Sequence, residues 1–321
     1  MIKLDKKDRK LLYELDCNSR QSVQQLSKKI GLSKDAVKYR LNKLIKNNII
    51  KSFNAVVDTG KLGYASYRLF VKLCNLSPEK EREIVEYLLA NNNLIWLVQV
   101  EGKWDINTWF LYKKLDEMNM FFVNYNRKYN SYIDKTEFGV YTKITYYSRG
   151  YLLGKKQEFE MPIGTLPDEK KLDENELKII GILSKNARAP IVEISKAAGL
   201  TPKTVINKIR RLEKDEIIIG YRTEFDLGRL GYRYYKMHIN THNTTEQKLK
   251  RFGQYIRIHP NIIYRDYVLG GYDIEIEIQV KSDTELRRLV EDIRTNFSDI
   301  IKDYEILHYY TEHRLRFYPF F

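Results

Sequence analysis

Basic, amide and hydroxyl side chains recur along two short stretches of the chain, residues 33–47 and 201–215. In both stretches apolar residues return at helical spacing, which predicts a helix with a polar outer face. Lysine and arginine on such a face can pair with phosphate, and asparagine, threonine or tyrosine can hydrogen-bond to base edges. The alternative is a charged helix face that is simply solvated. Together with a few residues upstream of each stretch, the candidate DNA contacts are Arg20, Ser22, Ser33, Lys34, Lys38, Tyr39, Arg40, Asn42, Lys43, Arg188, Thr201, Lys203, Thr204, Asn207, Lys208, Arg210 and Arg211.

A helix, a tight turn and a capped second helix are predicted to position these side chains. Ser22 can cap a helix that ends at Gly31, and Ser33 can cap the next one. Thr201 takes the place of Ser33 in the second stretch, and Pro202 follows at the first helical position, where a missing N–H costs nothing. The pattern is typical of a helix-turn-helix, in which the second helix can enter the major groove of DNA.

The positive charge of the chain is concentrated around the same two stretches. The net charge is +14. Residues 1–52 hold 14 Lys/Arg and 5 Asp/Glu, a net +9, and residues 171–222 hold 11 and 7, a net +4. About a third of the chain therefore carries nearly all of the excess, as expected of a surface that binds a polyanion such as double-stranded DNA.

The two stretches belong to one long internal repeat with an offset of 168 residues. Gly31-Leu32 recurs as Gly199-Leu200, and Gly60-x-Leu62-Gly63-Tyr64 recurs as Gly228-x-Leu230-Gly231-Tyr232. The same offset relates Gly102 to Gly270. A period this long does not fit a solenoid and indicates a two-domain unit duplicated in tandem.

Each copy is predicted to have an α+β fold in two parts. The helix-turn-helix part ends in a short extended segment, and the pattern that follows predicts the order β-α-β-β-α-β of a ferredoxin-like domain. The expected boundaries are 1–58 and 171–226 for the helix-turn-helix domains, 59–147 and 227–321 for the α/β domains, and 148–170 for a linker. Because both helices of such a domain cover one face of its sheet, the two bare faces are expected to pack together within the chain.

Each copy resembles the Lrp/AsnC family, the leucine-responsive or feast/famine regulators. In the first copy the resemblance rests on Leu4-Asp5, Asn18-Ser19-Arg20, Gly31-Leu32-Ser33, Leu62-Gly63-Tyr64 and Gly102-Lys103-Trp104-Asp105. In the second it rests on Asn186-Ala187-Arg188, Gly199-Leu200-Thr201 and Leu269-Gly270-Gly271-Tyr272-Asp273. The family implies a winged-helix DNA-binding domain followed by a ligand-sensing, dimerising α/β domain of the RAM type. Two copies in one chain would form a covalent pseudo-dimer, with pairing into a homodimer still open.

The resemblance also implies an effector pocket for an amino acid or another small molecule near the two glycine hairpins. The alternative is that the glycines only supply positive φ for tight turns. The candidate effector residues are Gly102, Trp104, Asp105, Gly270, Gly271, Tyr272 and Asp273.

Two further classes of protein remain as alternatives to a sequence-specific transcriptional regulator. One is an architectural protein that coats DNA with little sequence preference. The other is an enzyme like the siroheme decarboxylases, which share the two-domain plan. All five histidines lie in the second copy without a metal-binding spacing, and no nucleophile, paired-carboxylate or P-loop motif is present. We therefore expect no enzymatic activity, cofactor or metal.

The composition and the N-terminal sequence favour a cytoplasmic protein with no membrane partner. It contains only two cysteines, begins without the apolar core of a signal peptide, and has no apolar run near 18 residues.

Overall fold

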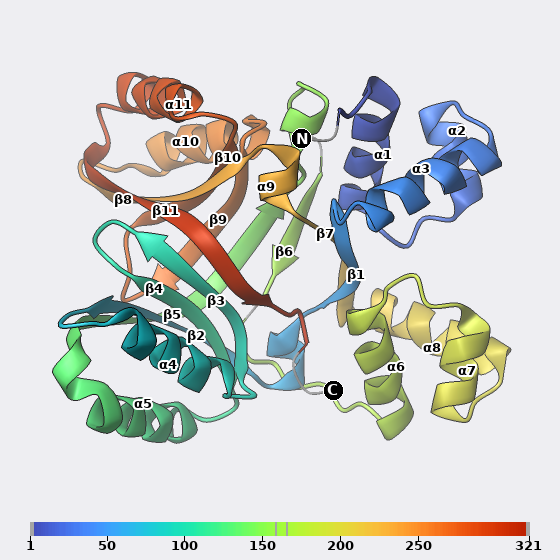
Figure 1. Ribbon diagram of the computed structural model, residues 1–321, viewed down its shortest axis with the longest axis horizontal. Coiled ribbons are helices and arrows are strands. Elements are labelled where there is room, and N and C mark those ends of the chain that lie inside the picture. The colour runs from blue at the N-terminus through green and yellow to red at the C-terminus, as the bar shows by residue number, and fades with distance from the viewer. Residues whose placement is uncertain (1–2, 158, 165, 319–321) are drawn as a thin grey trace.

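The computed structural model describes residues 3–157, 159–164 and 166–318. Two helix-turn-helix units lie on one side of the molecule and the α/β domains on the other (Figure 1). The first unit contains α1 (Lys6–Cys17), α2 (Val23–Ile30), α3 (Lys34–Lys46) and the strand β1 (Ile50–Val57). The second contains α6 (Glu174–Lys185), α7 (Ile191–Ala198), α8 (Pro202–Lys214) and β7 (Ile218–Phe225).

The predicted caps are confirmed, and they explain why these helices begin and end where they do. The Ser33 side chain accepts a hydrogen bond from the N–H of Ala36, and Thr201 accepts one from Thr204. Ser22 and Gln25 form a reciprocal capping box at the start of α2. Gly31, at φ 71°, ends α2 in the left-handed conformation that glycine adopts without strain.

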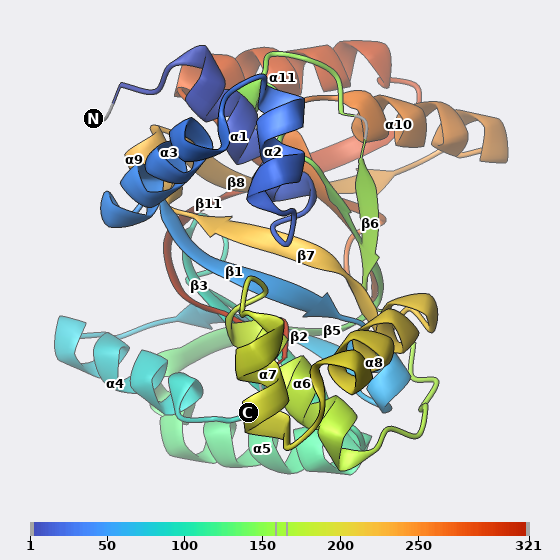
Figure 2. The same cartoon turned by 90° about the vertical axis from the view of Figure 1, so that its right-hand side faces the viewer.

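Strands β1 and β7 pair antiparallel and form a two-stranded ribbon between the two units (Figure 2). Each strand packs into the core of the opposite unit. Ala55 and Val57 of β1 join the core formed by α6, α7 and α8, whereas Phe225 at the end of β7 joins the core formed by α1, α2 and α3. Neither unit therefore completes its hydrophobic core without the other copy.

Both α/β domains have the predicted β-α-β-β-α-β order. In the first copy the elements are β2 (Ala65–Leu73), α4 (Pro78–Leu89), β3 (Leu94–Glu101), β4 (Ile106–Tyr112), α5 (Leu115–Tyr129) and β5 (Ile133–Tyr147). In the second they are β8 (Arg233–Thr241), α10 (Glu246–Ile258), β9 (Ile262–Leu269), β10 (Ile274–Val280), α11 (Asp283–Asn296) and β11 (Ile301–Leu315). The strand orders are β5-β2-β4-β3 and β11-β8-β10-β9.

The two four-stranded sheets are joined at both edges. Strand β3 pairs with β11, and β5 pairs with β9, all antiparallel. Together with the β2–β5 pairing, these ladders close eight strands into a barrel. The four long helices of the α/β domains lie outside it (Figure 1). The bare sheet faces thus enclose a shared interior, and closure removes the sheet edges that would otherwise stay unpaired.

Segment 148–170, which is a linker by composition, is largely built into the fold. Residues Gly150–Leu152 form a 3-10 turn, and Tyr151 and Leu152 pack into the core of the first helix-turn-helix unit. The short strand β6 (Glu160–Ile163) pairs with the end of β5. The backbone N–H groups of Tyr151 and Gln157 also bond to the carbonyls of Pro260 and Ile258, both at 3.3 Å, so this segment fastens the two copies together.

The remaining short elements are a 3-10 turn at Thr59–Leu62, another at Asn130–Tyr132, and α9 (Leu227–Leu230). Within the described ranges, no helix combines the length and the apolar character needed to cross a membrane.

Candidate nucleic-acid interface and the barrel interior

The outer faces of α3 and α8 expose a set of polar side chains that carry no ion pair among the described residues. Tyr39 is the most prominent, with 70% of its surface exposed. Its neighbours are basic or carry an amide, so this surface has the hydrogen-bonding groups that phosphates and base edges require. The exposed set is Lys34, Lys38, Tyr39, Asn42 and Lys43 on α3, and Lys203, Asn207 and Arg210 on α8.

Arg40 and Lys208 occupy equivalent positions on α3 and α8, and both are engaged inside their own units. Arg40 Nη1 lies 2.7 Å from Asp5 Oδ2 and 2.6 Å from Asp8 Oδ1, the residues of the α1 capping box. Lys208 pairs in the same way with Asp173 and with Glu176, at 3.6 Å from the latter. These two cations hold the third helix against the start of the first, so we remove them from the proposed DNA-contacting surface.

Arg20 and Arg188, also equivalent, form a reciprocal clasp between the two units. Arg188 Nη1 donates to the carbonyl oxygens of Ser19 at 2.6 Å and Gln21 at 2.8 Å. Arg20 Nη1 donates to the carbonyl of Ala187 in the second unit. Two backbone bonds repeat the pattern, from Ser19 N–H to the Tyr221 carbonyl at 2.9 Å and from Ala187 N–H to the Phe53 carbonyl at 2.7 Å. Both arginines therefore set the relative position of the units and are also removed from the proposed DNA-contacting surface.

The other candidates divide between capping and partial pairing. Ser22, Ser33 and Thr201 use their hydroxyl groups as helix caps, and Thr204 lies 2.8 Å from Thr201 through its hydroxyl. Arg211 pairs with Glu176 at 3.2 Å but remains half exposed. DNA contact by these residues stays a prediction.

The glycine hairpins have a clear structural function in the two α/β domains. Asp105 accepts from the backbone N–H of Leu73 at 2.6 Å, and Asp273 accepts from the N–H of Thr241 at 2.7 Å. Each carboxylate thus fastens its hairpin to the end of the neighbouring strand. Trp104 is completely buried and stacks on Phe70, so it presents no surface to a ligand.

Part of the candidate effector set does line a hollow. Gly270, Gly271 and Tyr272 from the second copy meet Lys103 from the first around an open depression of about 250 Å³. Lys103 Nζ lies 2.7 Å from the Tyr272 hydroxyl, which in turn lies 2.8 Å from Glu305. Both hairpins therefore contribute to one place, and effector binding there stays a prediction.

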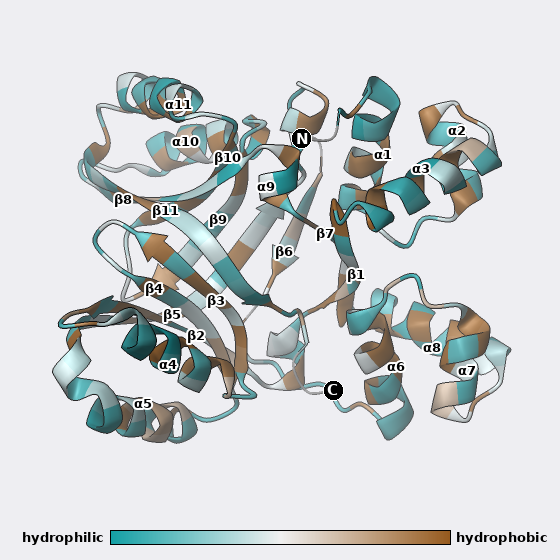
Figure 3. Cartoon of the chain, viewed as in Figure 1, coloured by the Kyte–Doolittle hydropathy of each residue, from teal (hydrophilic) through white to brown (hydrophobic). Residues whose placement is uncertain are grey.

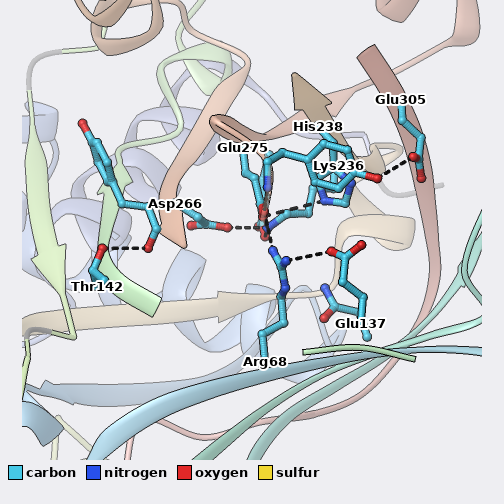
Figure 4. Close-up of polar contacts among 12 residues, drawn as sticks. Arg68, Glu137, Thr142, Lys236, His238, Asp266, Glu275 and Glu305 are labelled. Atoms are coloured by element: carbon cyan, nitrogen blue, oxygen red, sulfur yellow. Dashed lines mark hydrogen bonds and ion pairs between the residues drawn. The ribbon is translucent and has the colours of Figure 1, made fainter. Parts of the chain in front are cut away.

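A cluster of charged side chains lies inside the barrel (Figure 4). Arg68 on β2 pairs with Glu275 and, at 3.1 Å, with Glu137. Lys236 on β8 pairs with Asp266, with Glu275 at 3.1 Å and with Glu277 at 3.5 Å. Arg68, Lys236 and Glu275 have no exposed side-chain surface. Much of β11, a strand of the barrel wall, is also coloured hydrophilic (Figure 3), but several of its polar residues, such as Asp303 and His313, are exposed and lie outside this cluster.

Burial and pairing move the pKa values of this cluster in different directions. Burial raises the pKa of Glu275, but Lys236 and Arg68 outweigh it and lower the pKa to about 2. Burial raises the pKa of Glu277 to about 7, with Lys236 offsetting only part of the shift. Burial also lowers the pKa of His238 to about 3, and neither ring nitrogen has a hydrogen-bond partner among the described residues. Glu275 is therefore a permanent charge, whereas Glu277 can gain a proton near neutral pH.

Sequence reasoning missed this cluster. In β10 the residues Glu275, Glu277 and Gln279 alternate with isoleucines, a pattern that normally indicates one solvated and one buried strand face. Here the isoleucines face the covering helices and the acidic residues face the interior. Within the described ranges, no group of three or more His, Cys, Asp and Glu side chains has an arrangement that could hold a metal ion.

Comparison with known proteins places both copies among DNA-binding regulators. A family model described as a winged helix-turn-helix DNA-binding domain matches residues 4–51 and 172–219. An HTH-type transcriptional regulator of Pyrococcus horikoshii is 32% identical over 106 residues, which cover 32% of this chain and 69% of that protein. A second, from Pyrococcus furiosus, is 29% identical over 141 residues, which cover 44% of this chain and 93% of that protein.

The whole chain is similar in fold to an enzyme. The crystal structure of the siroheme decarboxylase NirDL aligns with 97% of this chain and 93% of that chain, with a TM-score of 0.64. The sequence identity is 13%, so the likeness concerns the architecture of two fused units and not the chemistry.

Proposed function

Because the chain belongs to the Lrp/AsnC family of helix-turn-helix transcriptional regulators, we propose that it works as a covalent pseudo-dimer whose α3 and α8 read two half-sites of one DNA duplex. The observation that carries the proposal is the reciprocal clasp of Arg20 and Arg188 across the β1–β7 ribbon. This arrangement supports a fixed spacing between the two recognition helices, as half-site recognition requires.

The exposed set on α3 and α8 supplies the contacts in this proposal. Lys34, Lys38 and Lys43 pair with phosphates on one half-site, and Lys203 and Arg210 on the other. Tyr39, Asn42 and Asn207 are exposed on the same helices, and in this proposal they contact base edges. The first unit carries the larger net charge, so we expect it to contribute more of the salt-dependent affinity.

The two half-sites are proposed to differ in sequence. Where α3 has Lys38 and Asn42, α8 has Ile206 and Arg210. A symmetric homodimer must read a palindrome, whereas two unequal helices in one chain need not. Selection of binding sites from random DNA should return an asymmetric site, and recovery of a perfect palindrome would contradict this part of the proposal.

The function is tested by measuring DNA affinity against salt concentration on the selected site. Replacing Lys38 or Lys43 by alanine should weaken binding and reduce the slope of log K against log salt by about 0.9 for each phosphate that is no longer neutralised. Lys128→Ala removes the same charge from α5, far from the helix-turn-helix units, and should leave the slope unchanged. Unchanged slopes for both α3 variants would refute the assignment of this face.

An architectural DNA-coating protein is the first alternative. Competition between the selected site and bulk DNA separates the two classes of protein. A sequence-specific regulator should prefer its site by about 10³-fold or more, whereas a coating protein should show a ratio near one.

An enzymatic role like that of siroheme decarboxylase is favoured only by the whole-chain likeness in fold. The cavity at one end of the barrel has a volume of about 60 Å³, whereas pockets for drug-sized ligands measure roughly 300–1,000 Å³. A tetrapyrrole would therefore need the barrel to open. Absence of a Soret band after mixing the purified protein with an iron tetrapyrrole is the expected result.

A further inference from the structure

A narrow cavity of about 60 Å³ lies at the end of the barrel that faces the β1–β7 ribbon. We call it the barrel cavity. Its lining combines residues of both copies, with Trp109 on β4, Arg149 after β5, Arg222 on β7 and Gln279 on β10. The lining also holds four carboxylates, each bonded to another group: Asp266 and Glu277 to Lys236, Glu224 to Ser52, and Glu312 to Trp96. Apolar side chains, among them Ile144, Ile163 and Leu315, form another part of the wall. The space is small and is assembled only when both copies are in place.

Arg222 is the most unusual residue of this lining. It is only 3% exposed, and no carboxylate pairs with it among the described residues. One Nη donates to the Tyr264 hydroxyl, and the guanidinium lies 3.4 Å from the centre of the Tyr146 ring. In the part of the chain that the structure describes, Nε has no hydrogen-bond partner. An arginine cannot release its proton, so a buried guanidinium without an anion is costly to the fold.

Two more N–H groups on the lining are also unused. The Gln279 Oε1 atom accepts from Arg149 Nε at 3.0 Å and contacts the Tyr151 hydroxyl at 2.5 Å. Because an arginine can only donate, this contact fixes the orientation of the amide, and Gln279 Nε2 has no partner within the described ranges. Trp109 Nε1, which can only donate, also has no partner there. Three strands thus bring three unpaired donors to one cavity, against the general rule that buried polar groups are satisfied.

We propose that the barrel cavity binds a small aliphatic monocarboxylate, with its carboxylate held by Arg222 and the neighbouring N–H donors of Gln279 and Trp109. A carboxylate supplies the negative charge that Arg222 lacks and enough lone pairs for several donors. The volume admits a chain of only a few carbon atoms, and the apolar part of the wall suits such a chain. The carboxylates of the lining are bonded to Lys236, Ser52 and Trp96, so none of them neutralises Arg222 by an ion pair among the described residues. This site differs from the open hollow at the hairpins, which lies around Lys103 and Tyr272.

Binding at this site acts on the ribbon that holds the two recognition helices. Arg222 follows Tyr221, whose carbonyl accepts the backbone bond from Ser19 of the first unit. Phe225, three residues further along β7, lines the barrel cavity and also packs into the core of that unit. An anion that fixes Arg222 therefore fixes β7, and we expect it to change affinity for DNA. This regulatory consequence rests on the proposed function, whereas ligand binding itself does not.

The first experiment is isothermal titration calorimetry of the full chain, without DNA, with acetate, propionate and butyrate, and with propionamide as the neutral analogue. We expect saturable binding of at least one carboxylate and at least tenfold weaker binding of propionamide. No binding of any of the three carboxylates, or equal affinity for propionamide, would overturn the proposal.

Two variants locate the site, with one matched control. Arg222→Met should reduce affinity for the carboxylate at least tenfold, and Trp109→Phe, which keeps an aromatic ring and removes only the N–H donor, should reduce it several-fold. Arg229→Met removes an exposed arginine close in sequence and should leave binding unchanged. Unchanged binding in both cavity variants, with folding verified by circular dichroism, would place the ligand elsewhere and overturn the assignment.

A parallel DNA titration distinguishes failure of the cavity proposal from failure of the proposed function. If DNA binds but the carboxylates do not, the cavity proposal fails and the proposed function stands. If the carboxylates bind in an Arg222-dependent manner but DNA does not, the cavity proposal stands and the proposed function fails.

Discussion

The clasp between the two helix-turn-helix units makes Arg188→Ala an informative substitution. The variant loses two hydrogen bonds, to the carbonyls of Ser19 and Gln21, while the β1–β7 ribbon stays paired. Hydrogen bonds to a charged group contribute about 1.5–3 kcal/mol each. Relief of the repulsion from Arg20, which together with burial lowers the pKa of Arg188, offsets part of that loss. We expect a net loss of about 2 kcal/mol in the free energy that holds the units in register.

That loss should appear in DNA binding only when both half-sites are present. A penalty of about 2 kcal/mol corresponds to a reduction in affinity of more than tenfold for the full site. Affinity for a duplex with a single half-site should stay within about twofold, because one unit binds there without the geometric constraint. The assay is fluorescence anisotropy on both duplexes, with Arg82→Ala on α4 as the control that removes equal charge from an exposed position. An equal loss on both duplexes, or none on either, would refute the reasoning.

Three other substitutions test particular contacts. Arg40→Ala should lower the midpoint of thermal unfolding, because it leaves the nearly buried Asp8 carboxylate without its partner. The same substitution should change the salt dependence of DNA binding less than Lys38→Ala does. A larger change would show that Arg40 contacts DNA. Burial raises the pKa of Glu277 from 4.5 in the unfolded chain to about 7 in the folded chain. Between these two pH values only the folded state holds the proton, so the free energy of unfolding should fall as pH rises through that window. Urea titrations at several pH values should show that Glu277→Gln removes this pH-dependent loss of unfolding free energy. The same pH dependence in the variant would contradict the raised pKa of Glu277. Gly271→Val should destabilise the fold, since a Cβ atom there would lie 2.7 Å from Glu275 Oε1 and 2.8 Å from Arg68 Nη2; an unchanged thermal midpoint would show that these side chains move aside.

The helix-turn-helix units could be predicted from the sequence because their signals are local. The Ser33 cap needs only the backbone three residues later, and the end of α2 needs only the freedom of Gly31 to adopt positive φ. The order of elements in both α/β domains followed from hydrophobic periodicity for the same reason.

The functions of individual cations could not be predicted because they depend on distant partners. Arg40 and Lys38 lie two residues apart on one helix, and both are basic residues that the sequence offers as candidate DNA contacts. Only the fold shows that Arg40 reaches Asp5, 35 positions away, while Lys38 stays unpaired among the described residues. Arg188 depends further on how two copies dock, which no periodicity encodes. The alternation of Glu275 and Glu277 with isoleucine does not by itself distinguish a solvated strand face from the inner face of a closed barrel, because barrel closure is not visible within one strand.

Joining two copies in one chain lets the halves of the barrel interior diverge independently. The acidic residues Glu275 and Glu277 of the second copy correspond, at the 168-residue offset, to Asn107 and Trp109 of the first. In an assembly of identical subunits every interior substitution would occur twice, and two sets of these carboxylates would share one core. At these two positions of the fused chain, one half supplies acids and the other supplies a neutral amide and an aromatic ring. Such halves are no longer interchangeable. A barrel built from two second halves would bury twice as many of these carboxylates, so exchange of halves between chains is disfavoured. Each barrel therefore keeps one first half and one second half.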